Sequence, residues 1–307
     1  MMWNLVDYSF VKNKNFQNHI SKRGWHKADL VSSNQLNDLR ILFDENHEIN
    51  QVGMFYSMYS KDLSYRKKVR DGILTILAPL LNAEFEDYKV AYAIFVVKTP
   101  GEETEFFLHQ DPSIVDEHKY SSLHLWIPLE KITEKNGPLC LIEGTHLASQ
   151  PYRGITVPSF FKGNEGLLRE YLKPIYLDEG EAILLDPRVV HNSLANLSDK
   201  TRVAALVGII PEDSEIILSH CEAGSEENVV EQHLFSDDYF LNGQGFYLNC
   251  ECRPENGKML NSKKWDIKPL SEEEILKKFD ALGISRTNQI SVNHNLSECV
   301  MFGEPKS

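Results

Sequence analysis

The sequence contains fewer basic than acidic residues and has no long hydrophobic run. Its 32 lysines and arginines against 45 aspartates and glutamates give a formal net charge of -13. Nucleic acids and anionic membranes attract basic surfaces, so this balance disfavours both as partners. The basic stretch YRKKVR at 65–70 is short, and we expect it on the exposed side of a helix. The longest apolar run, VAALVGII at 203–210, is far below the roughly 20 residues of a membrane-spanning helix, which predicts a soluble protein.

Cysteine is also scarce, and the first residues lack the features of an export signal. The chain has five cysteines among its 307 residues, an odd number that cannot all pair as disulfides within the chain. The start MMWNLVDYSFVKNKNF has no apolar signal core. Both features predict a reducing, cytoplasmic location. Cys250 and Cys252 are separated by one residue, rather than the about two to four of ordinary zinc sites, which favours structural thiols.

Three segments have the pattern of amphipathic helices. Ser32 and Gln35 form a capping box before a run of leucines at helical spacing. A second helix fits 64–82, where Pro79 is expected to kink the helix or to end it early. A third, with its own capping box, fits 271–283. We therefore expect helices before and after the central part of the chain.

After Phe85 the pattern changes to short β-type segments separated by turn residues. They are YKVAYAIFVVK, EFFLHQD, YSSLHLWIPLE, PLCLIEGTH, KPIYL, EAILLD and TRVAALVGIIP. Many short strands with preceding helices predict a mainly β fold with flanking helices, a sandwich or a barrel. We expect a single domain over 1–307, with a helical lead-in at 1–85, a strand core at 86–211 and a C-terminal extension at 212–307.

A histidine and an aspartate stand two residues apart in EFFLHQDPS at 105–113. Because side chains alternate across a strand, Phe107, His109 and Asp111 are predicted to share one face. His191, which follows a turn in LLDPRVVHNS, is the best candidate for a third ligand. Two histidines and one carboxylate on one side of an iron leave positions open for a co-substrate and O₂, as in non-haem Fe(II) oxygenases.

Arg202 follows His191 by eleven residues, across the loop ANLSDK. A hairpin at this loop would bring Arg202 beside His191. A buried arginine can bind a carboxylate through two parallel hydrogen bonds, as an anchored keto acid requires. The alternative is an ordinary salt bridge to Asp186 or Asp199.

The ordered set HQD, WIPLEKITEKNGPLCLIEGTH, HNS and Arg202 resembles the phytanoyl-CoA dioxygenase family of Fe(II)/2-oxoglutarate oxygenases. The resemblance covers about residues 20–211 and implies a double-stranded β-helix, or jelly roll, with the metal between its sheets. It implies that the iron ligands are His109, Asp111 and His191. It also implies that the residues at the co-substrate are Arg202 on the distal carboxylate of 2-oxoglutarate, Ser193 through its hydroxyl, and Trp126 in the pocket wall.

The reaction implied by this resemblance uses Fe(II), 2-oxoglutarate and O₂, releases succinate and CO₂, and hydroxylates a C–H bond of a small-molecule substrate. Related halogenases have a small residue at the position of Asp111, so the carboxylate favours hydroxylation or desaturation over halogenation. Two alternatives stay open, a non-catalytic jelly-roll ligand-binding protein and a cupin-like metalloenzyme that does not use 2-oxoglutarate. The extension at 212–307 could cover the substrate.

The roles of several other residues near these motifs are predicted less specifically. Trp126 and His124 share a strand face, and Trp126 could equally be core while His124 is expected to be a hydrogen-bonded core histidine. Lys98 is expected to be a solvated strand end rather than a carboxylate contact. His146 is expected to fix a turn, although EGTHLASQPYRG also allows a functional reading that includes Arg153.

Overall fold

The computed structural model describes residues 7–47, 52–222, 229–242, 253–254, 256–265 and 268–287. Cys250 and Cys252 lie outside these ranges. Within them, no helix combines the length and the apolar character needed to cross a membrane.

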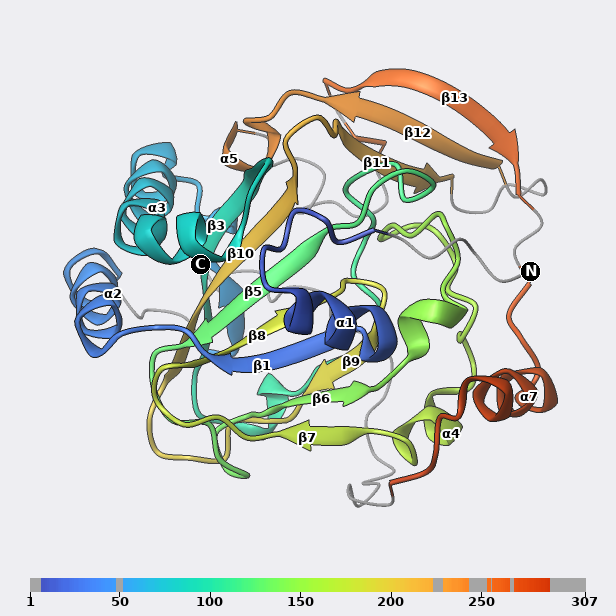
Figure 1. Ribbon diagram of the computed structural model, residues 1–307, viewed down its shortest axis with the longest axis horizontal. Coiled ribbons are helices and arrows are strands. Elements are labelled where there is room, and N and C mark those ends of the chain that lie inside the picture. The colour runs from blue at the N-terminus through green and yellow to red at the C-terminus, as the bar shows by residue number, and fades with distance from the viewer. Residues whose placement is uncertain are drawn as a thin grey trace.

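Two antiparallel β-sheets face each other at the centre of the molecule (Figure 1). The larger has six strands, in the spatial order β1 (Trp25–Asp29), β8 (Glu181–Leu185), β5 (Leu123–Pro128), β10 (Arg202–Pro211), β3 (Tyr88–Lys98) and β2 (Met54–Tyr56). The smaller has four, in the order β4 (Phe106–His109), β9 (Val190–Ser193), β6 (Leu139–Ile142) and β7 (Lys173–Ile175). From β3 to β10 the chain changes sheet after every strand except β6. This winding is a double-stranded β-helix, which confirms the predicted fold class.

Helices cover the outer face of each sheet, and strand alternation explains how (Figure 1). In β5, Leu123, Leu125 and Ile127 pack outward with helical residues, whereas Trp126 packs inward between the sheets. The helices on the larger sheet are α1 (Lys14–Arg23), α2 (Ser33–Asn46) and α3 (Leu63–Glu84). Those on the smaller sheet are α4 (Glu165–Arg169) and α7 (Glu272–Leu282). Short 3-10 helices are η1 (Ser57–Tyr59), η2 (Glu102–Thr104) and η3 (Thr145–Ala148).

The predicted helices are present, with one difference at a proline. The capping boxes of α2 and α7 both form, the first through Ser32 and Gln35. However, α3 does not end at Pro79 but continues to Glu84. Leu80 and the residue after it are buried against the larger sheet, so this packing offsets the lost backbone hydrogen bond.

Strands occur in two regions where the sequence did not predict them. The lead-in contains β1 and β2, and the extension contains a three-stranded sheet of β11 (Ile216–Cys221), β12 (Val229–Phe235) and β13 (Lys258–Lys264). Every residue of β11 is buried, so the strand has no alternation to detect. The short helix α5 (Tyr239–Asn242) follows β12 and packs near α3, where Arg66 donates to the carbonyl of Leu241 at 2.9 Å. Arg66 is therefore buried, unlike the exposed position expected for the YRKKVR stretch.

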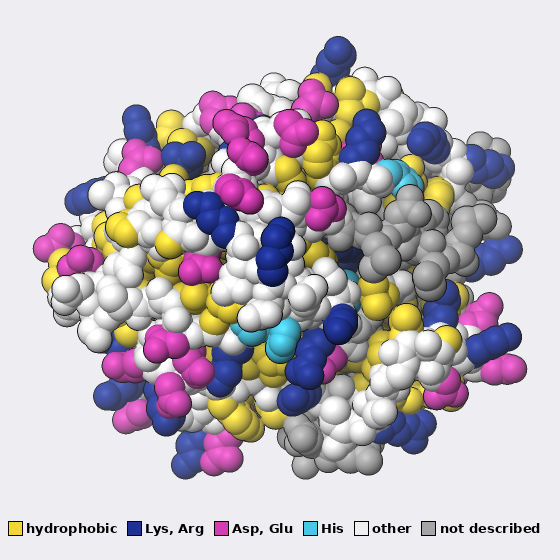
Figure 2. Space-filling view, in the orientation of Figure 1, with side chains coloured by type: hydrophobic (Ala, Val, Ile, Leu, Met, Phe, Trp, Pro, Cys, Tyr) yellow, Lys and Arg dark blue, Asp and Glu magenta, His cyan; other side chains and the backbone are white. Residues whose placement is uncertain are grey.

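The described part of the surface in Figure 2 mixes acidic and basic side chains. Lysines and arginines are interspersed with aspartates and glutamates over this face, and hydrophobic side chains lie between them. This face therefore carries no concentration of a single charge among the residues described.

Candidate metal centre

Two of the proposed ligands lie side by side in the smaller sheet. Where β4 pairs with β9, His109 is directly opposite His191, and Phe106 is opposite Ser193. The register shifts between these two pairs, because β4 has one more residue than β9 over the same interval. Such bulges redirect side chains, and here the two imidazole centroids lie 4.2 Å apart.

Asp111 lies beyond the end of β4, so the predicted alternation over Phe107, His109 and Asp111 is wrong in detail. The bulge and the early end of the strand both interrupt it. The backbone N–H of Asp111 donates to the carbonyl of Pro187 at 2.9 Å. Pro187 belongs to the turn that leads into β9, so this bond ties the Asp111 segment to the strand that carries His191.

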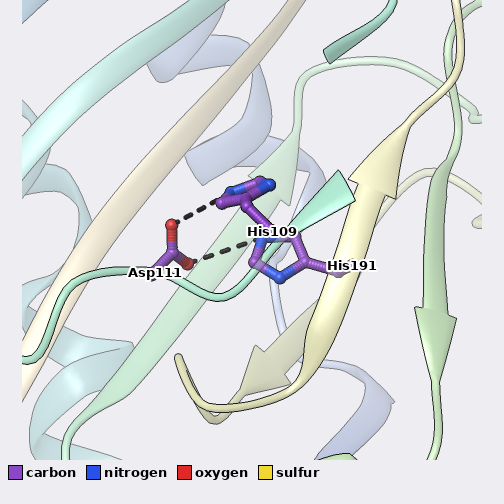
Figure 3. Close-up of side chains that lie close together, drawn as sticks. All are labelled: His109, Asp111 and His191. Atoms are coloured by element: carbon purple, nitrogen blue, oxygen red, sulfur yellow. Dashed lines mark ion pairs between the residues drawn. The ribbon is translucent and has the colours of Figure 1, made fainter. Parts of the chain in front are cut away.

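The three side chains nevertheless converge on one point (Figure 3). Oδ1 of Asp111 lies 3.3 Å from Nε2 of His109, and Oδ2 lies 3.5 Å from Nε2 of His191. One ligand atom from each residue lies within 4.8 Å of the other two. His109, Asp111 and His191 are the one group of three or more histidine, cysteine or acidic side chains among the described residues that lie close enough together to hold a metal ion.

The hydrogen bonds of the two histidines fix which nitrogen is available to a metal. Nδ1 of His109 lies 2.9 Å from the carbonyl of Phe107, and Nδ1 of His191 lies 2.9 Å from that of Val189. A carbonyl oxygen only accepts, so Nδ1 carries the hydrogen and Nε2 of each neutral ring has a lone pair. Both lone pairs face the carboxylate of Asp111. Three acceptors that face one another suit a cation between them.

The protonation of the group suits a metal ion. Burial, and then the neighbouring His109, lower the pKa of His191 to about 4, so this ring is neutral at pH 7. Burial alone would raise the pKa of Asp111, but in acid the charge of the protonated His191, followed by hydrogen bonds from His109 and His124, outweighs burial and holds that pKa well below its ordinary value. Neutral imidazole and ionised carboxylate are the forms that bind metals.

A buried ion pair stabilises the turn before β9. Asp186 is fully buried, accepts from Nε of Arg188 at 2.9 Å and also accepts from the hydroxyl of Tyr8. Burial opposes ionisation of Asp186, but Arg188 outweighs it and holds the pKa of this carboxyl below its ordinary value. Because the folded pKa is lower than the unfolded one, the pair stabilises the fold above about pH 4, and this contribution is lost as the pH falls further.

Replacing this carboxylate is expected to reduce stability and its dependence on pH. Asp186→Ala leaves Arg188 buried without its partner and should lower the free energy of unfolding by about 3–5 kcal/mol at pH 7. Asp186→Asn should also flatten the fall in stability below pH 4. Urea unfolding at neutral and acidic pH measures both effects, with Asp237→Asn at an exposed ion pair as the control. Equal acid sensitivity of Asp186→Asn and the parent would contradict this assignment.

Arg202 reaches the centre from the opposite sheet, so the predicted hairpin with His191 is wrong. The strands β9 and β10 lie in different sheets, and Arg202 pairs with Lys98 of β3. Its side chain is 1% exposed, and Nε and Nη1 have no hydrogen-bond partner among the described residues. Its guanidinium carbon lies 5.4 Å from the ring centroid of Trp126. Burial lowers the pKa of Arg202 to about 10, so the side chain remains a cation at neutral pH.

The two alternatives for Arg202 do not occur. Asp186 pairs with Arg188, and no ion pair joins Arg202 to Asp199 or to another acid in the described part of the chain. Lys98 is also unlike its prediction, because it is fully buried rather than a solvated strand end. Its Nζ donates to Oγ of Ser193 at 2.6 Å and to the carbonyl of Leu194 at 2.7 Å.

A cavity of about 580 Å³ lies between the proposed metal ligands and Arg202. All six residues predicted for the site line it, namely His109, Asp111, Trp126, His191, Ser193 and Arg202. The rest of its wall is mainly aromatic and aliphatic, and includes Tyr56, Phe106 and, from α5 in the extension, Phe240. The cavity therefore has a polar end at the proposed ligands and an apolar body.

The remaining predicted residues have different environments. His124 is a buried, hydrogen-bonded histidine as expected, but it lines the cavity and its Nδ1 lies 3.2 Å from Asp111. His146 bonds to the carbonyl of Ser21 at 3.1 Å, in agreement with a structural role. Arg153 forms a buried ion pair with Glu117 and donates from Nε to the carbonyl of Asp111 at 2.9 Å. The position of His124 two residues before Trp126, on the same strand face, is the signal that could have placed it here.

The chain also matches a family profile over more than half of its length. The profile of phytanoyl-CoA dioxygenase (PhyH) matches residues 34–204, a range that includes both histidines, the aspartate and the arginine described above. The chain belongs to the phytanoyl-CoA dioxygenase family. The phytanoyl-CoA dioxygenase of Arabidopsis thaliana is 28% identical over 174 residues, which are 54% of this chain and 58% of that protein. Phytanoyl-CoA dioxygenase domain-containing protein 1 of Bos taurus is 29% identical over 164 residues, 51% of this chain and 55% of that protein. The matches thus span little more than half of these relatives.

Solved structures resemble this phytanoyl-CoA dioxygenase family member at low identity. The α-ketoglutarate-dependent carbocyclase SnoK from nogalamycin biosynthesis is 18% identical, with a TM-score of 0.48 and coverage of 66% of this chain and 86% of that chain. EctD from S. alaskensis, solved with 2-oxoglutarate and 5-hydroxyectoine, is 14% identical, with a TM-score of 0.48 and coverage of 70% and 85%.

Proposed function

We propose that the protein is an Fe(II)- and 2-oxoglutarate-dependent dioxygenase that oxidises a C–H bond of a small-molecule substrate. The observation that carries this proposal is the set of three acceptors from His109, Asp111 and His191, which face one another and suit a single cation. Two imidazoles and one carboxylate are the ligand set of non-haem Fe(II) oxygenases. Membership of the phytanoyl-CoA dioxygenase family supports the same chemistry.

His109, Asp111 and His191 would hold the iron, which when bound supplies the activation of O₂. Each histidine keeps Nε2 available because its Nδ1 donates to a backbone carbonyl. The backbone of Asp111 is fixed on both sides, by Pro187 and Arg153. The protein thus contributes a ligand set that is oriented before the metal binds.

Arg202 suits the distal carboxylate of 2-oxoglutarate. It lines the cavity, its side chain is buried, and its Nε and Nη1 have no hydrogen-bond partner among the described residues. A buried cation without an acid partner is costly unless an anion binds to it. Lys98 donates to Oγ of Ser193, so the hydroxyl hydrogen of Ser193 is free to donate to that anion. Trp126 packs against the guanidinium of Arg202 and would limit its movement.

The substrate end of the cavity favours a molecule with a substantial apolar surface. Aromatic and aliphatic side chains, among them Tyr56, Phe106 and Phe240, form most of its wall. Asp111 occupies the position where a small residue would leave room for a halide, so we propose hydroxylation or desaturation rather than halogenation. Phe240 gives the extension a place in the wall, in line with a substrate-covering role for that part of the chain.

Release of succinate tests this function without knowledge of the substrate. With Fe(II), 2-oxoglutarate and O₂, the protein should slowly form succinate in amounts above its own concentration, and omission of iron or O₂ should stop it. Asp111→Asn, which keeps the shape of the side chain, serves as the matched inactive variant. Bound iron and 2-oxoglutarate without any succinate would favour a binding protein instead. Metal-dependent chemistry that needs no 2-oxoglutarate would favour a cupin-like enzyme.

A further inference from the structure

A third imidazole lies beside the proposed metal centre, on the larger sheet. His124 of β5 is 7% exposed, and its Nδ1 lies 3.2 Å from Oδ2 of Asp111. Its Nε2 lies 2.6 Å from the hydroxyl of Tyr92, on β3. His124 does not belong to the group of ligand atoms within 4.8 Å of one another found among the described residues. His124 therefore contacts the proposed ligand Asp111 but is not itself one of the proposed ligands.

The chemistry of the three groups gives these hydrogen bonds a direction. An ionised carboxylate only accepts, so Nδ1 of His124 donates to Asp111. In a neutral ring, Nε2 then carries the lone pair and accepts from the hydroxyl of Tyr92. A hydrogen-bonded chain thus runs from Tyr92 through His124 to Asp111, and it fixes the tautomer of the imidazole.

A glycine between the two strands makes this chain possible. Gly208 of β10 is opposite Tyr92 on one side and opposite His124 on the other. A Cβ at position 208 would lie 2.6 Å from two carbons of the Tyr92 ring. Because glycine has no side chain, the ring can lie across β10 and reach His124. Phe240 packs edge-on against Tyr92, with ring centroids 5.1 Å apart.

We propose that His124, held by Tyr92, is a positioning residue that sets the orientation of the Asp111 carboxylate for the metal. This inference rests on the proposed metal centre. Asp111 lies past the end of β4, so strand pairing does not hold its side chain. With Oδ2 bonded to His124, rotation of the carboxylate is restrained and Oδ1 faces His109. Partners of this kind typically contribute about 10–100-fold to metal affinity.

Two isosteric variants separate this role from simple packing. Asparagine places its amide nitrogen near the position of Nδ1, whereas glutamine places it near that of Nε2. His124→Asn therefore keeps the donor to Asp111, and His124→Gln loses it. Calorimetric titration of the metal-free protein with Mn²⁺, without co-substrate, is expected to give an affinity about 10–100-fold weaker for His124→Gln. The loss should be only about three- to tenfold for His124→Asn, which keeps the donor to Asp111 but loses the contact with Tyr92.

Further variants keep the test decisive. Tyr92→Phe removes only the hydroxyl and should weaken Mn²⁺ binding by about three- to tenfold, which supplies the result even if His124→Gln fails to fold. His146→Gln, at a buried histidine away from the centre, should leave the affinity unchanged. Equal Mn²⁺ affinity in the parent, His124→Gln and Tyr92→Phe would overturn the positioning role while leaving the metal centre intact. A parent that binds no Mn²⁺ would overturn the proposed function and this inference together.

Discussion

Asp111→Ala and His191→Ala are each expected to abolish turnover of 2-oxoglutarate and to weaken metal binding by more than roughly 100-fold, since even outer partners of a ligand contribute about 10–100-fold. Each substitution removes one of the three acceptors that face the centre. Only two of the three side chains would then remain to bind the metal. Metal content after dialysis and the rate of succinate release measure the two effects.

The fold itself should survive these substitutions. Asp111 and His191 line the cavity and belong to none of the hydrophobic core clusters, so their removal should not sharply lower the thermal midpoint of the metal-free protein. His19→Ala, at an exposed histidine, controls for the loss of any imidazole. Metal content and activity equal to those of the parent in either ligand variant would contradict the assignment of the centre.

Arg202→Met is expected to raise the concentration of 2-oxoglutarate needed for half-maximal turnover by about 10–150-fold. A hydrogen bond to a charged group contributes about 1.5–3 kcal/mol, and each 1.4 kcal/mol corresponds to about tenfold in affinity. Arg202→Lys keeps the charge but not the two parallel donors, so it should restore only part of the loss. Succinate release over a range of 2-oxoglutarate concentrations measures the change.

The effect should be confined to the co-substrate. Mn²⁺ affinity of Arg202→Met in the absence of 2-oxoglutarate should match that of the parent, because Arg202 does not contact the three ligands. Arg40→Met, at an exposed pair with Glu179, is the matched control for removal of an arginine. An unchanged requirement for 2-oxoglutarate in Arg202→Met would contradict the placement of the distal carboxylate at Arg202.

The sequence contained enough information to propose the site, because its residues occur in short motifs. His109 and Asp111 are two residues apart, and His191 follows a turn. These patterns, with the family resemblance, predicted residues that do lie around one cavity. The strand alternation and the hairpin predicted to bring them together are both absent. The bulge in β4 and the passage of the chain from β9 into the other sheet depend on pairings between distant strands, which no local pattern reports.

Buried polar residues were the least predictable part of the site. Lys98 ends a strand and has the pattern of an exposed residue, but the opposite sheet supplies Ser193 as its partner. His124 could be placed on an inward face, yet its contact with Asp111 arises from the approach of a different segment. The sheet of β11 to β13 was missed for a related reason, since burial of every residue in β11 removes the alternation that identifies a strand.

We propose that one iron and one 2-oxoglutarate bind together at His109, Asp111 and His191. The most direct measurement is the visible spectrum of the protein prepared without oxygen, after addition of Fe(II) and then of 2-oxoglutarate. An iron-bound keto acid has a weak charge-transfer band. We predict that this band appears in the parent only after both additions and is absent in Asp111→Ala. A folded parent that binds Fe(II) and shows no band with saturating 2-oxoglutarate would contradict the account.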